Sequence, residues 1–323
     1  MARTALITTP HARCLLGLQA APAEFLRRLL ALSRDAASPG PGVPGAIVAN
    51  LFFEDSTRTR TSFSVAARRL GAEVVDLLGG VSSVSKGETL IDTARNVEAM
   101  GVAALVVRAR QAGSSAMIAR AVRIPVINAG DGRHEHPTQG LLDTLTLAQA
   151  FGREGDFDLA GLRVAIVGDV ASSRVARSAI AAMTTLGADV TVVGPPALAP
   201  RSFESLGAHV SHTLDDVLPR MDAVMMLRIQ FERHAGGTPP PAGVPPKSAA
   251  IASVREYRAF YALTPERAER MKKRAIVMHP GPINRGIELD EAVADGPRSV
   301  ILRQVSNGVL VRMGVLRWCL GEA

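Results

Sequence analysis

The sequence predicts an α/β fold of two doubly wound parallel-sheet domains, with the active site in the cleft between them. Short apolar runs alternate with segments whose apolar residues recur at helical spacing, as in parallel sheets covered by helices. The same alternation occurs in both halves, and 323 residues are enough for two domains with cores. A polar segment with several acids, at residues 152–161, separates the halves.

The first half is predicted to hold four strands, at residues 46–53, 72–78, 103–107 and 125–128. Helical spacing predicts helices at residues 22–32, 63–70, 90–100, 114–121 and 141–149. Residues 38–45 are rich in proline and glycine and predict a loop. Small and hydroxyl residues at 79–88 predict a flexible surface loop, or else a loop that carries Lys86 and a serine to an anion.

The second half is predicted to hold strands at residues 162–169, 188–193, 222–227 and 275–278. Helices are predicted at residues 175–186, 264–273 and 309–320, and a proline-rich loop at 236–246. We expect a first domain at residues 1–149 and a second at 150–302. A C-terminal helix at about 303–323 is expected to pack back on the first domain.

The turn at residues 56–59 lies between a predicted buried strand and a predicted helix. Backbone N–H groups are free at a helix start, where the positive end of the helix dipole points outward. The neighbouring hydroxyls and the forked guanidinium of Arg58 add donors suited to phosphate. We interpret the turn as an anion site, against the alternative of an ordinary helix cap with solvated arginines.

Other polar side chains follow the predicted strands at their carboxyl ends, where open α/β sheets bind ligands. They are Arg108, His136, Gln139, Arg174, Arg228 and Gln230. With Arg58, these residues would make the cleft strongly positive, which suits anionic substrates. A transfer through a charged tetrahedral state needs donors directed at the developing oxyanion.

Composition narrows the class of function. The net charge is +7, but the arginines are scattered and aromatic residues make up only 4% of the chain, so we expect no nucleic-acid partner. No apolar run is long enough to span a membrane, and we expect no membrane association. Cys14 and Cys319 form no CxxC pair, which fits a reducing cytoplasm.

The segment His134-Glu135-His136 invites a metal interpretation. The HExxH spacing is absent, however, and a zinc site would need further ligands from elsewhere in the fold. We therefore expect no metal, and a neutral histidine that hydrogen-bonds a carbonyl or phosphoryl oxygen. The glycines after the strand at 162–169 do not match GxGxxG, so no nicotinamide cofactor is predicted.

Five motifs in order span nearly the whole chain. They are Phe-Glu-Asp-Ser-Thr-Arg-Thr-Arg at 53–60, Ser-Lys-Gly-Glu at 85–88, His-Pro-Thr-Gln at 136–139, Arg-Ile-Gln at 228–230 and His-Pro-Gly-Pro at 279–282. Together they resemble the catalytic chains of the aspartate carbamoyltransferase family. The resemblance implies that carbamoyl phosphate and L-aspartate give N-carbamoyl-L-aspartate and phosphate, the committed step of pyrimidine synthesis. It implies no covalent intermediate, metal or cofactor.

The resemblance also implies roles for individual residues. The phosphate is held by Ser56, Thr57, Arg58 and Thr59. The carbamoyl carbonyl is polarised by Thr59, Arg108 and His136, and the carbamoyl nitrogen is contacted by Gln139. The aspartate carboxylates are bound by Arg174, Arg228 and Gln230. The backbone around Gly281 and Pro282 contacts the carbamoyl amide.

By the same resemblance, the minimal active unit is a homotrimer in which a neighbouring subunit contributes Ser82 and Lys86 to each site. This implication favours the anion-seeking interpretation of the loop at 79–88. Further assembly with a regulatory chain or a dihydroorotase stays open. The chain departs from the family at Asp55, where proline is usual, and in the composition of the proline-rich segment after Arg233.

Two alternatives compete with this interpretation. Ornithine carbamoyltransferases share the Ser-Thr-Arg-Thr-Arg turn and His-Pro-Thr-Gln, but are expected to carry His-Cys-Leu-Pro where this chain has His-Pro-Gly-Pro. Arg228 and Gln230 suit a carboxylate side chain, whereas an ammonium group would be repelled by the arginine. An inactive paralogue acting as a scaffold would be expected to have lost the arginines, and none is missing. We therefore expect an enzyme.

Overall fold

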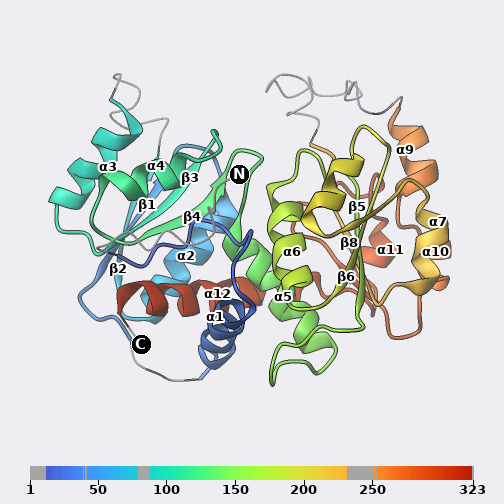
Figure 1. Ribbon diagram of the computed structural model, residues 1–323, viewed down its shortest axis with the longest axis horizontal. Coiled ribbons are helices and arrows are strands. Elements are labelled where there is room, and N and C mark those ends of the chain that lie inside the picture. The colour runs from blue at the N-terminus through green and yellow to red at the C-terminus, as the bar shows by residue number, and fades with distance from the viewer. Residues whose placement is uncertain are drawn as a thin grey trace.

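The computed structural model describes residues 12–38, 40, 42–78, 88–230, 251 and 253–321. These residues form two parallel β-sheets flanked by helices, which confirms the predicted fold class (Figure 1). Ser82, Lys86 and the predicted loop at 236–246 lie outside the described residues. Within the described ranges, no helix is long and apolar enough to cross a membrane.

The first sheet has the strand order β2-β1-β3-β4. Side chains of β1 alternate between two apolar layers: Val48 and Phe52 belong to the layer of α1, α2 and α5, whereas Ala49 and Leu51 belong to the layer of α3 and α4. The strands are β1 (Ile47–Phe52), β2 (Glu73–Leu78), β3 (Ala104–Ala109) and β4 (Val126–Asp131). The helices are α1 (Ala23–Asp35), α2 (Thr57–Arg69), α3 (Leu90–Ala99), α4 (Ser114–Ala121) and α5 (Pro137–Ala150).

The second sheet has the order β7-β6-β5-β8-β9. Its strands are β5 (Arg163–Val167), β6 (Asp189–Val193), β7 (His209–Ser211), β8 (Ala223–Met226) and β9 (Ile276–Met278). Its helices are α6 (Arg174–Thr185), α7 (Leu214–Val217), α9 (Val254–Tyr261), α10 (Pro265–Glu269) and α11 (Glu291–Ala294), with 3-10 turns η2 (Arg201–Leu206) and η3 (Leu218–Arg220). Strand β7 and helices α7, α9 and α11 are additions to the predicted elements.

Two helix contacts join the halves. Helix α5 of the first sheet packs against α6 of the second. Helix α12 (Ile301–Leu320) follows the second sheet in sequence but packs against α1, α2 and α5 (Figure 1). Near its end, the Trp318 ring meets Phe25 edge-on, with centroids 5.1 Å apart. We propose a first domain of residues 1–149 with 303–323, and a second of residues 150–302.

Four helices begin earlier than the sequence predicts. Helix α2 begins at Thr57 rather than at residue 63, so the predicted turn at residues 56–59 already holds its first helical residues. Helix α5 begins at Pro137 rather than at residue 141, because proline fits the first helical position. Helix α6 begins at Arg174, with the Ser173 hydroxyl capping the N–H of Ala176 at 3.1 Å. Helix α12 begins at Ile301 rather than at residue 309. The sequence missed this first part because buried Gln304 and Asn307, which bond α5, interrupt the apolar period before Val309.

Candidate active site

A cavity of about 960 Å³ lies between the two sheets, at the carboxyl ends of their strands. It brings together twelve of the fourteen predicted site residues: Ser56, Thr57, Arg58, Thr59, Arg108, His136, Gln139, Arg174, Arg228, Gln230, Gly281 and Pro282. Ser82 and Lys86, the other two, lie outside the described residues. Residues that are distant in sequence therefore share one site, as the strand-end argument predicts.

The strand orders explain why arginines from both halves meet. In the first sheet the order reverses between β1 and β3, and Arg108 lies on β3 at that point. In the second sheet the order reverses between β5 and β8, and the chain leaves those strands toward Arg174 and Arg228. Loops diverge at such reversals and leave a crevice. The two crevices form one positively charged cavity.

The turn after β1 has the form of an anion site. Helix α2 begins at Thr57, and Ser56 precedes it with a side chain that makes no capping hydrogen bond to the helix. This contradicts the alternative of an ordinary serine cap. Thr59 is buried and Arg58 is exposed to the cavity. The hydroxyls and the helix start are therefore available to a ligand.

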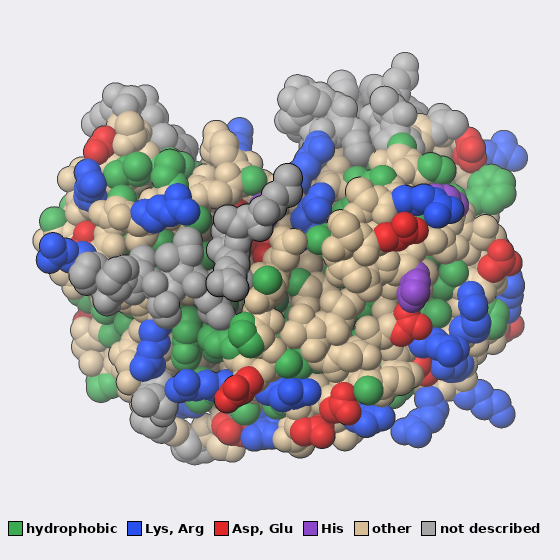
Figure 2. All heavy atoms as spheres, viewed as in Figure 1, with side chains coloured by type: hydrophobic (Ala, Val, Ile, Leu, Met, Phe, Trp, Pro, Cys, Tyr) green, Lys and Arg blue, Asp and Glu red, His purple; other side chains and the backbone are tan. Residues whose placement is uncertain are grey.

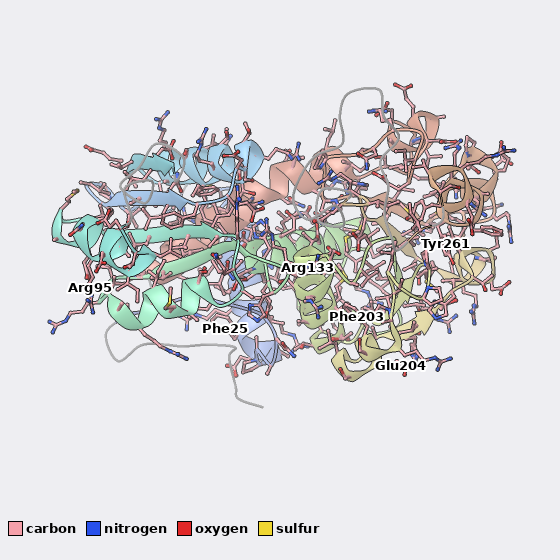
Figure 3. All side chains as sticks on the ribbon, turned by 90° about the horizontal axis from the view of Figure 1, so that it is seen from above. Phe25, Arg95, Arg133, Phe203, Glu204 and Tyr261 are labelled. Carbon is pink, nitrogen blue, oxygen red and sulfur yellow. The ribbon has the colours of Figure 1, made fainter. Side chains whose placement is uncertain are left out.

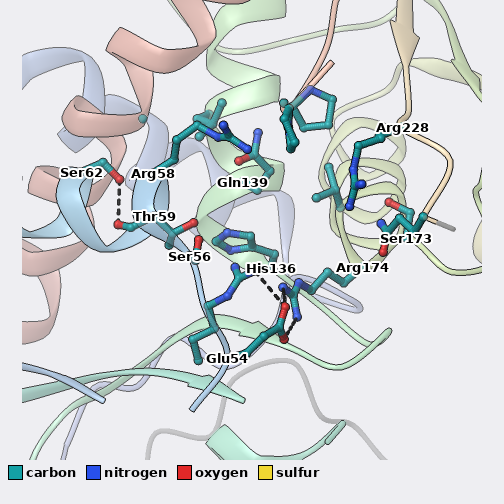
Figure 4. A pocket seen from close by; sticks show the side chains of 18 of the residues that line it. Glu54, Ser56, Arg58, Thr59, Ser62, His136, Gln139, Ser173, Arg174 and Arg228 are labelled. Carbon is teal, nitrogen blue, oxygen red and sulfur yellow. Dashed lines mark hydrogen bonds and ion pairs between the residues drawn. The ribbon is translucent and has the colours of Figure 1, made fainter. Parts of the chain in front are cut away.

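Glu54 joins the two halves of the cavity (Figure 4). Its carboxylate accepts two hydrogen bonds from Arg174 of α6, at 2.9 and 2.8 Å, and one from Arg108 of β3, at 3.1 Å. The bidentate geometry holds the Arg174 guanidinium in one orientation. Glu54 thus orients two predicted substrate-binding arginines and neutralises part of their charge.

His136 is buried at the start of α5 and points into the cavity (Figure 4). Burial first, and then the charges of Arg108, Arg312 and Arg174, hold the pKa of its imidazole well below the usual range. Its Nδ1 has no hydrogen-bond partner among the described residues. A neutral histidine with an uncommitted ring nitrogen is suited to bonding a substrate oxygen or nitrogen.

The neighbours of His136 point elsewhere, which weakens the metal interpretation. The Nδ1 atom of His134 lies 3.1 Å from Asp131 Oδ2. Glu135 accepts from the backbone N–H groups of Leu18 and Gln19, at 2.8 and 3.0 Å, and so ties the N-terminal segment down. Within the described residues, no group of three His, Cys, Asp or Glu side chains has an arrangement suited to a metal ion.

Two family models match the chain. The carbamoyl-phosphate-binding domain of aspartate/ornithine carbamoyltransferases matches residues 14–149, and the aspartate/ornithine-binding domain matches residues 160–319. The chain belongs to the aspartate/ornithine carbamoyltransferase family. An aspartate carbamoyltransferase catalytic subunit of Myxococcus xanthus is 52% identical over 311 residues, which cover 95% of this chain and 99% of that relative.

Solved structures of family members share the whole fold. Aspartate transcarbamoylase from Trypanosoma cruzi, in complex with N-(phosphonacetyl)-L-aspartic acid, has a TM-score of 0.82 at 30% identity and covers 96% of both chains. Ornithine carbamoyltransferase from Pyrococcus furiosus has a TM-score of 0.80 at 26% identity and covers 97% of this chain and 98% of that one. The fold alone therefore does not separate the two branches of the family.

The branches differ in the second substrate, which directs attention to the second-sheet side of the cavity. Arg228 and Gln230 follow β8 and line that side. The N–H of Gln230 donates to buried Asp169 at 3.3 Å, which fixes the backbone there. The Gly281–Pro282 bond is cis, and a Cβ added at Gly281 would lie 3.6 Å from Arg58 Nε. The segment after β9 therefore lies beside Arg58 and the turn at residues 56–59.

Sequence reasoning missed three further arginines of the cavity. Arg110 and Arg133 line it from the first domain, and Arg133 lies between the two halves in Figure 3. Arg312 is buried on α12 with its guanidinium 5.1 Å from the centroid of Phe63, and burial lowers its pKa to about 9. A charged residue within an apolar helix is the pattern that identifies Arg312 as a candidate.

The departure at Asp55 lies in the cavity lining. Asp55 is exposed there, next to the turn that holds Arg58. Seven arginines of the described residues share the lining with two acids: Arg58, Arg108, Arg110, Arg133, Arg174, Arg228 and Arg312, against Glu54 and Asp55. The cavity stays strongly positive despite the extra acid.

Proposed function

We propose that this chain transfers the carbamoyl group of carbamoyl phosphate to the amine of L-aspartate, giving N-carbamoyl-L-aspartate and phosphate. The observation that carries the proposal is the meeting of arginines from both sheets in one cavity. Carbamoyl phosphate is a dianion and aspartate carries two carboxylates, so several fixed cations are needed to offset their repulsion. Relatives named aspartate carbamoyltransferase catalytic subunits support the same activity, and the reaction belongs to pyrimidine synthesis.

In this proposal the first-domain side binds carbamoyl phosphate. The start of α2, with Ser56, Thr57, Arg58 and Thr59, holds the phosphate, because free N–H groups and a forked cation suit it. Arg108, His136 and Thr59 donate to the carbamoyl oxygen as it gains negative charge. Gln139 and the backbone at Gly281 and Pro282 hold the carbamoyl nitrogen.

The second-domain side binds L-aspartate through Arg174, Arg228 and Gln230 in this proposal. The aspartate amine then attacks the carbamoyl carbon directly, the C–N bond forms, and the bond to the phosphate oxygen breaks. The departing phosphate accepts the amine proton, which removes the need for a strong side-chain base. A neutral His136 fits a reaction without a side-chain base, since it can donate a hydrogen bond to the carbamoyl oxygen without acting as a general acid.

The test is purified chain with carbamoyl phosphate, offered L-aspartate and L-ornithine in parallel. Phosphate release and carbamoylated product are both followed. Product with aspartate alone is expected, and Arg228→Met should abolish it while the chain stays folded. Product with ornithine alone would contradict the proposed second substrate, and a folded chain inactive with both would favour a scaffold role.

We also propose a homotrimer in which Ser82 and Lys86 complete the site of a neighbouring subunit. A mixing experiment tests this proposal. Arg58→Ala and Lys86→Ala are expected to be inactive alone, because each removes a group from every site. Mixed after dissociation and reassembly, they should regain activity, since some sites then combine intact halves. Failure to regain activity, with trimers formed, would contradict shared sites.

A cytoplasmic location remains part of the proposal, supported by Cys14 and Cys319, which are buried and form no disulfide among the described residues. On the face of the molecule drawn in Figure 2, lysine and arginine side chains are scattered rather than gathered in a patch. This distribution favours small anionic ligands over nucleic acid. Association with a regulatory chain or a dihydroorotase is tested by size-exclusion chromatography of the untagged complex from its native source.

A further inference from the structure

Two buried polar residues at the cavity, Asp143 behind its wall and Gln304 in its lining, have no role in the reaction proposed above. Asp143 of α5 is fully buried, and Gln304 of α12 is nearly so. The Asp143 Oδ1 atom accepts a hydrogen bond from Gln139 Nε2 at 2.9 Å and another from Gln304 Nε2 at 2.8 Å. One carboxylate oxygen therefore fixes two amide side chains that both line the cavity.

The hydrogen bonds continue into the second domain. Gln304 Oε1 accepts from the backbone N–H of His279 at 2.9 Å, and His279 Nδ1 accepts from the N–H of Gly281 at 2.8 Å. Because Nδ1 is an acceptor, the ring proton lies on Nε2, which is 3.2 Å from buried Glu288 Oε1. An unbroken series of bonds thus runs from Gln139 through Asp143, Gln304 and His279 to Gly281.

The two ends of this series face the same substrate group. Gln139 and the Gly281–Pro282 segment both line the cavity, from different domains, and both are assigned to the carbamoyl nitrogen in the function proposed above. Their separation sets the space for a planar amide. Displacement of a reacting group by about 1 Å costs roughly a hundredfold in rate. A rigid link between them therefore has a direct catalytic consequence.

We propose that Asp143 and Gln304 are positioning residues that fix Gln139 and the Gly281–Pro282 segment relative to one another across the two domains. The inference rests on the proposed carbamoyl transfer, because that reaction gives the two ends a common ligand. Neither residue touches the reacting atoms in this proposal. Both act through the groups that they hold.

The electrostatics of Asp143 agree with this role. Burial raises the pKa of its carboxyl to about 7, while the hydrogen bonds from Gln304 and Gln139 and the charge of Arg312 act in the opposite direction. Its Oδ2 atom has no hydrogen-bond partner among the described residues. Burial makes this carboxyl costly to ionise. Both of its hydrogen bonds nevertheless end on one oxygen, so that oxygen is an acceptor shared by Gln139 and Gln304.

A matched pair of variants tests the inference. Gln304→Met removes the amide in the series at nearly constant volume. Asn307→Leu removes a neighbouring buried amide of α12, which bonds Thr146 Oγ1 at 2.8 Å and Gln149 Oε1 at 2.7 Å on the same helix α5, outside the cavity. Both changes delete hydrogen bonds between α12 and α5, so a purely structural role would affect both alike.

The expected result is a split between the two variants. Gln304→Met should lower kcat roughly tenfold to a hundredfold, and Asn307→Leu by less than about threefold, at similar losses of thermal stability. Asp143→Asn, which keeps an oxygen acceptor, should retain most of the activity that Asp143→Leu loses. If Asp143→Leu does not fold, Gln304→Glu replaces it, since it keeps the acceptor for His279 and loses the donor to Asp143.

Amide hydrogen exchange at Gly281 gives a readout that needs no substrate. Its N–H should exchange faster in Gln304→Met than in the unmodified chain. In Asn307→Leu its exchange rate should equal that of the unmodified chain. Equal kcat and equal exchange in the two variants would overturn the inference. An unmodified chain that makes no carbamoyl-aspartate would contradict the proposed function instead, and the exchange comparison would still decide whether the link exists.

Discussion

At the scale of single residues, His136 is the side chain whose protonation state matters most. Its pKa is held well below the usual range, chiefly by burial, so the imidazole is neutral where a free histidine would titrate and should give no limb there in the pH–rate profile. His136→Ala should lower kcat roughly a hundredfold, as loss of one oxyanion donor does, without changing the shape of the profile. The measurement is kcat/KM against pH for both proteins. A limb that disappears in the variant would identify His136 as a general acid or base.

Asp143 should make stability depend on pH. Its pKa is about 7 in the folded chain and 3.8 ordinarily, so the folded state keeps a proton that the unfolded state releases between these values. The contribution to stability is full below about pH 4 and is lost as pH rises through 7. Asp143→Asn should therefore unfold at a higher temperature than the unmodified chain at pH 8, but not at pH 4. Exposed Asp216→Asn serves as the control, and equal shifts would contradict the assignment.

Asp55 should weaken binding of carbamoyl phosphate, because its exposed carboxylate lines the cavity beside Arg58. Asp55→Pro restores the residue usual in the family, and Asp55→Asn removes the charge alone. Both should lower the KM for carbamoyl phosphate by about two- to tenfold at low salt, and the difference should shrink as salt screens the charge. An unchanged KM at low salt would mean that the carboxylate does not act on the phosphate.

At the scale of elements, the crossing of α5 and α6 depends on a glycine. A Cβ added at Gly140 would lie 2.6 Å from the backbone oxygen of Ser178, and backbone atoms cannot rotate away. Gly140→Ala should therefore destabilise the chain by about 1–3 kcal/mol, as overpacking does. The measurement is the free energy of unfolding from chemical denaturation. The control is Gly155→Ala, because Gly155 is exposed with open space around it. Equal stability of the two variants would show that the crossing relaxes.

Elements were predictable where one period dominates the sequence. The first sheet and its helices follow from apolar runs such as residues 46–53 and from helical spacing, and the strand-end argument identified Arg108, Arg174 and Arg228. The apolar period predicted α12 only from residue 309, eight residues after its start at Ile301, because Gln304 and Asn307 face inward and bond α5, a contact that exists only after folding. Asp143 and Glu54 were not predicted as site residues, because their significance lies in the partners that folding gives them.

At the scale of the whole molecule, Glu54 sets how firmly the two halves are held together before substrates bind. Glu54→Gln leaves Arg174 and Arg108 without their shared carboxylate, at side-chain exposures of only 6% and 11%. Without ligand, Glu54→Gln should unfold at a lower temperature than the unmodified chain. Carbamoyl phosphate should then raise the unfolding temperature of Glu54→Gln more than that of the unmodified chain, because the anion supplies the missing charge.

The control for Glu54 is Asp76→Asn. Asp76 lies on β2, outside the cavity lining, and its carboxylate accepts a hydrogen bond from Asn50 at 2.7 Å. Its response to carbamoyl phosphate should equal that of the unmodified chain. Equal responses in Glu54→Gln would mean that the ligand does not compensate for the lost carboxylate.

The path of α12 has a consequence for how the protein is made. The helix packs its buried Val311, Val315 and Leu316 on the first domain, yet a ribosome synthesises it after the entire second sheet. Pulse proteolysis of ribosome-bound chains from which residue 300 has emerged should find the segment 160–300 protected while α1 and α2 are still cleaved. The domain translated first is therefore the domain that finishes folding last.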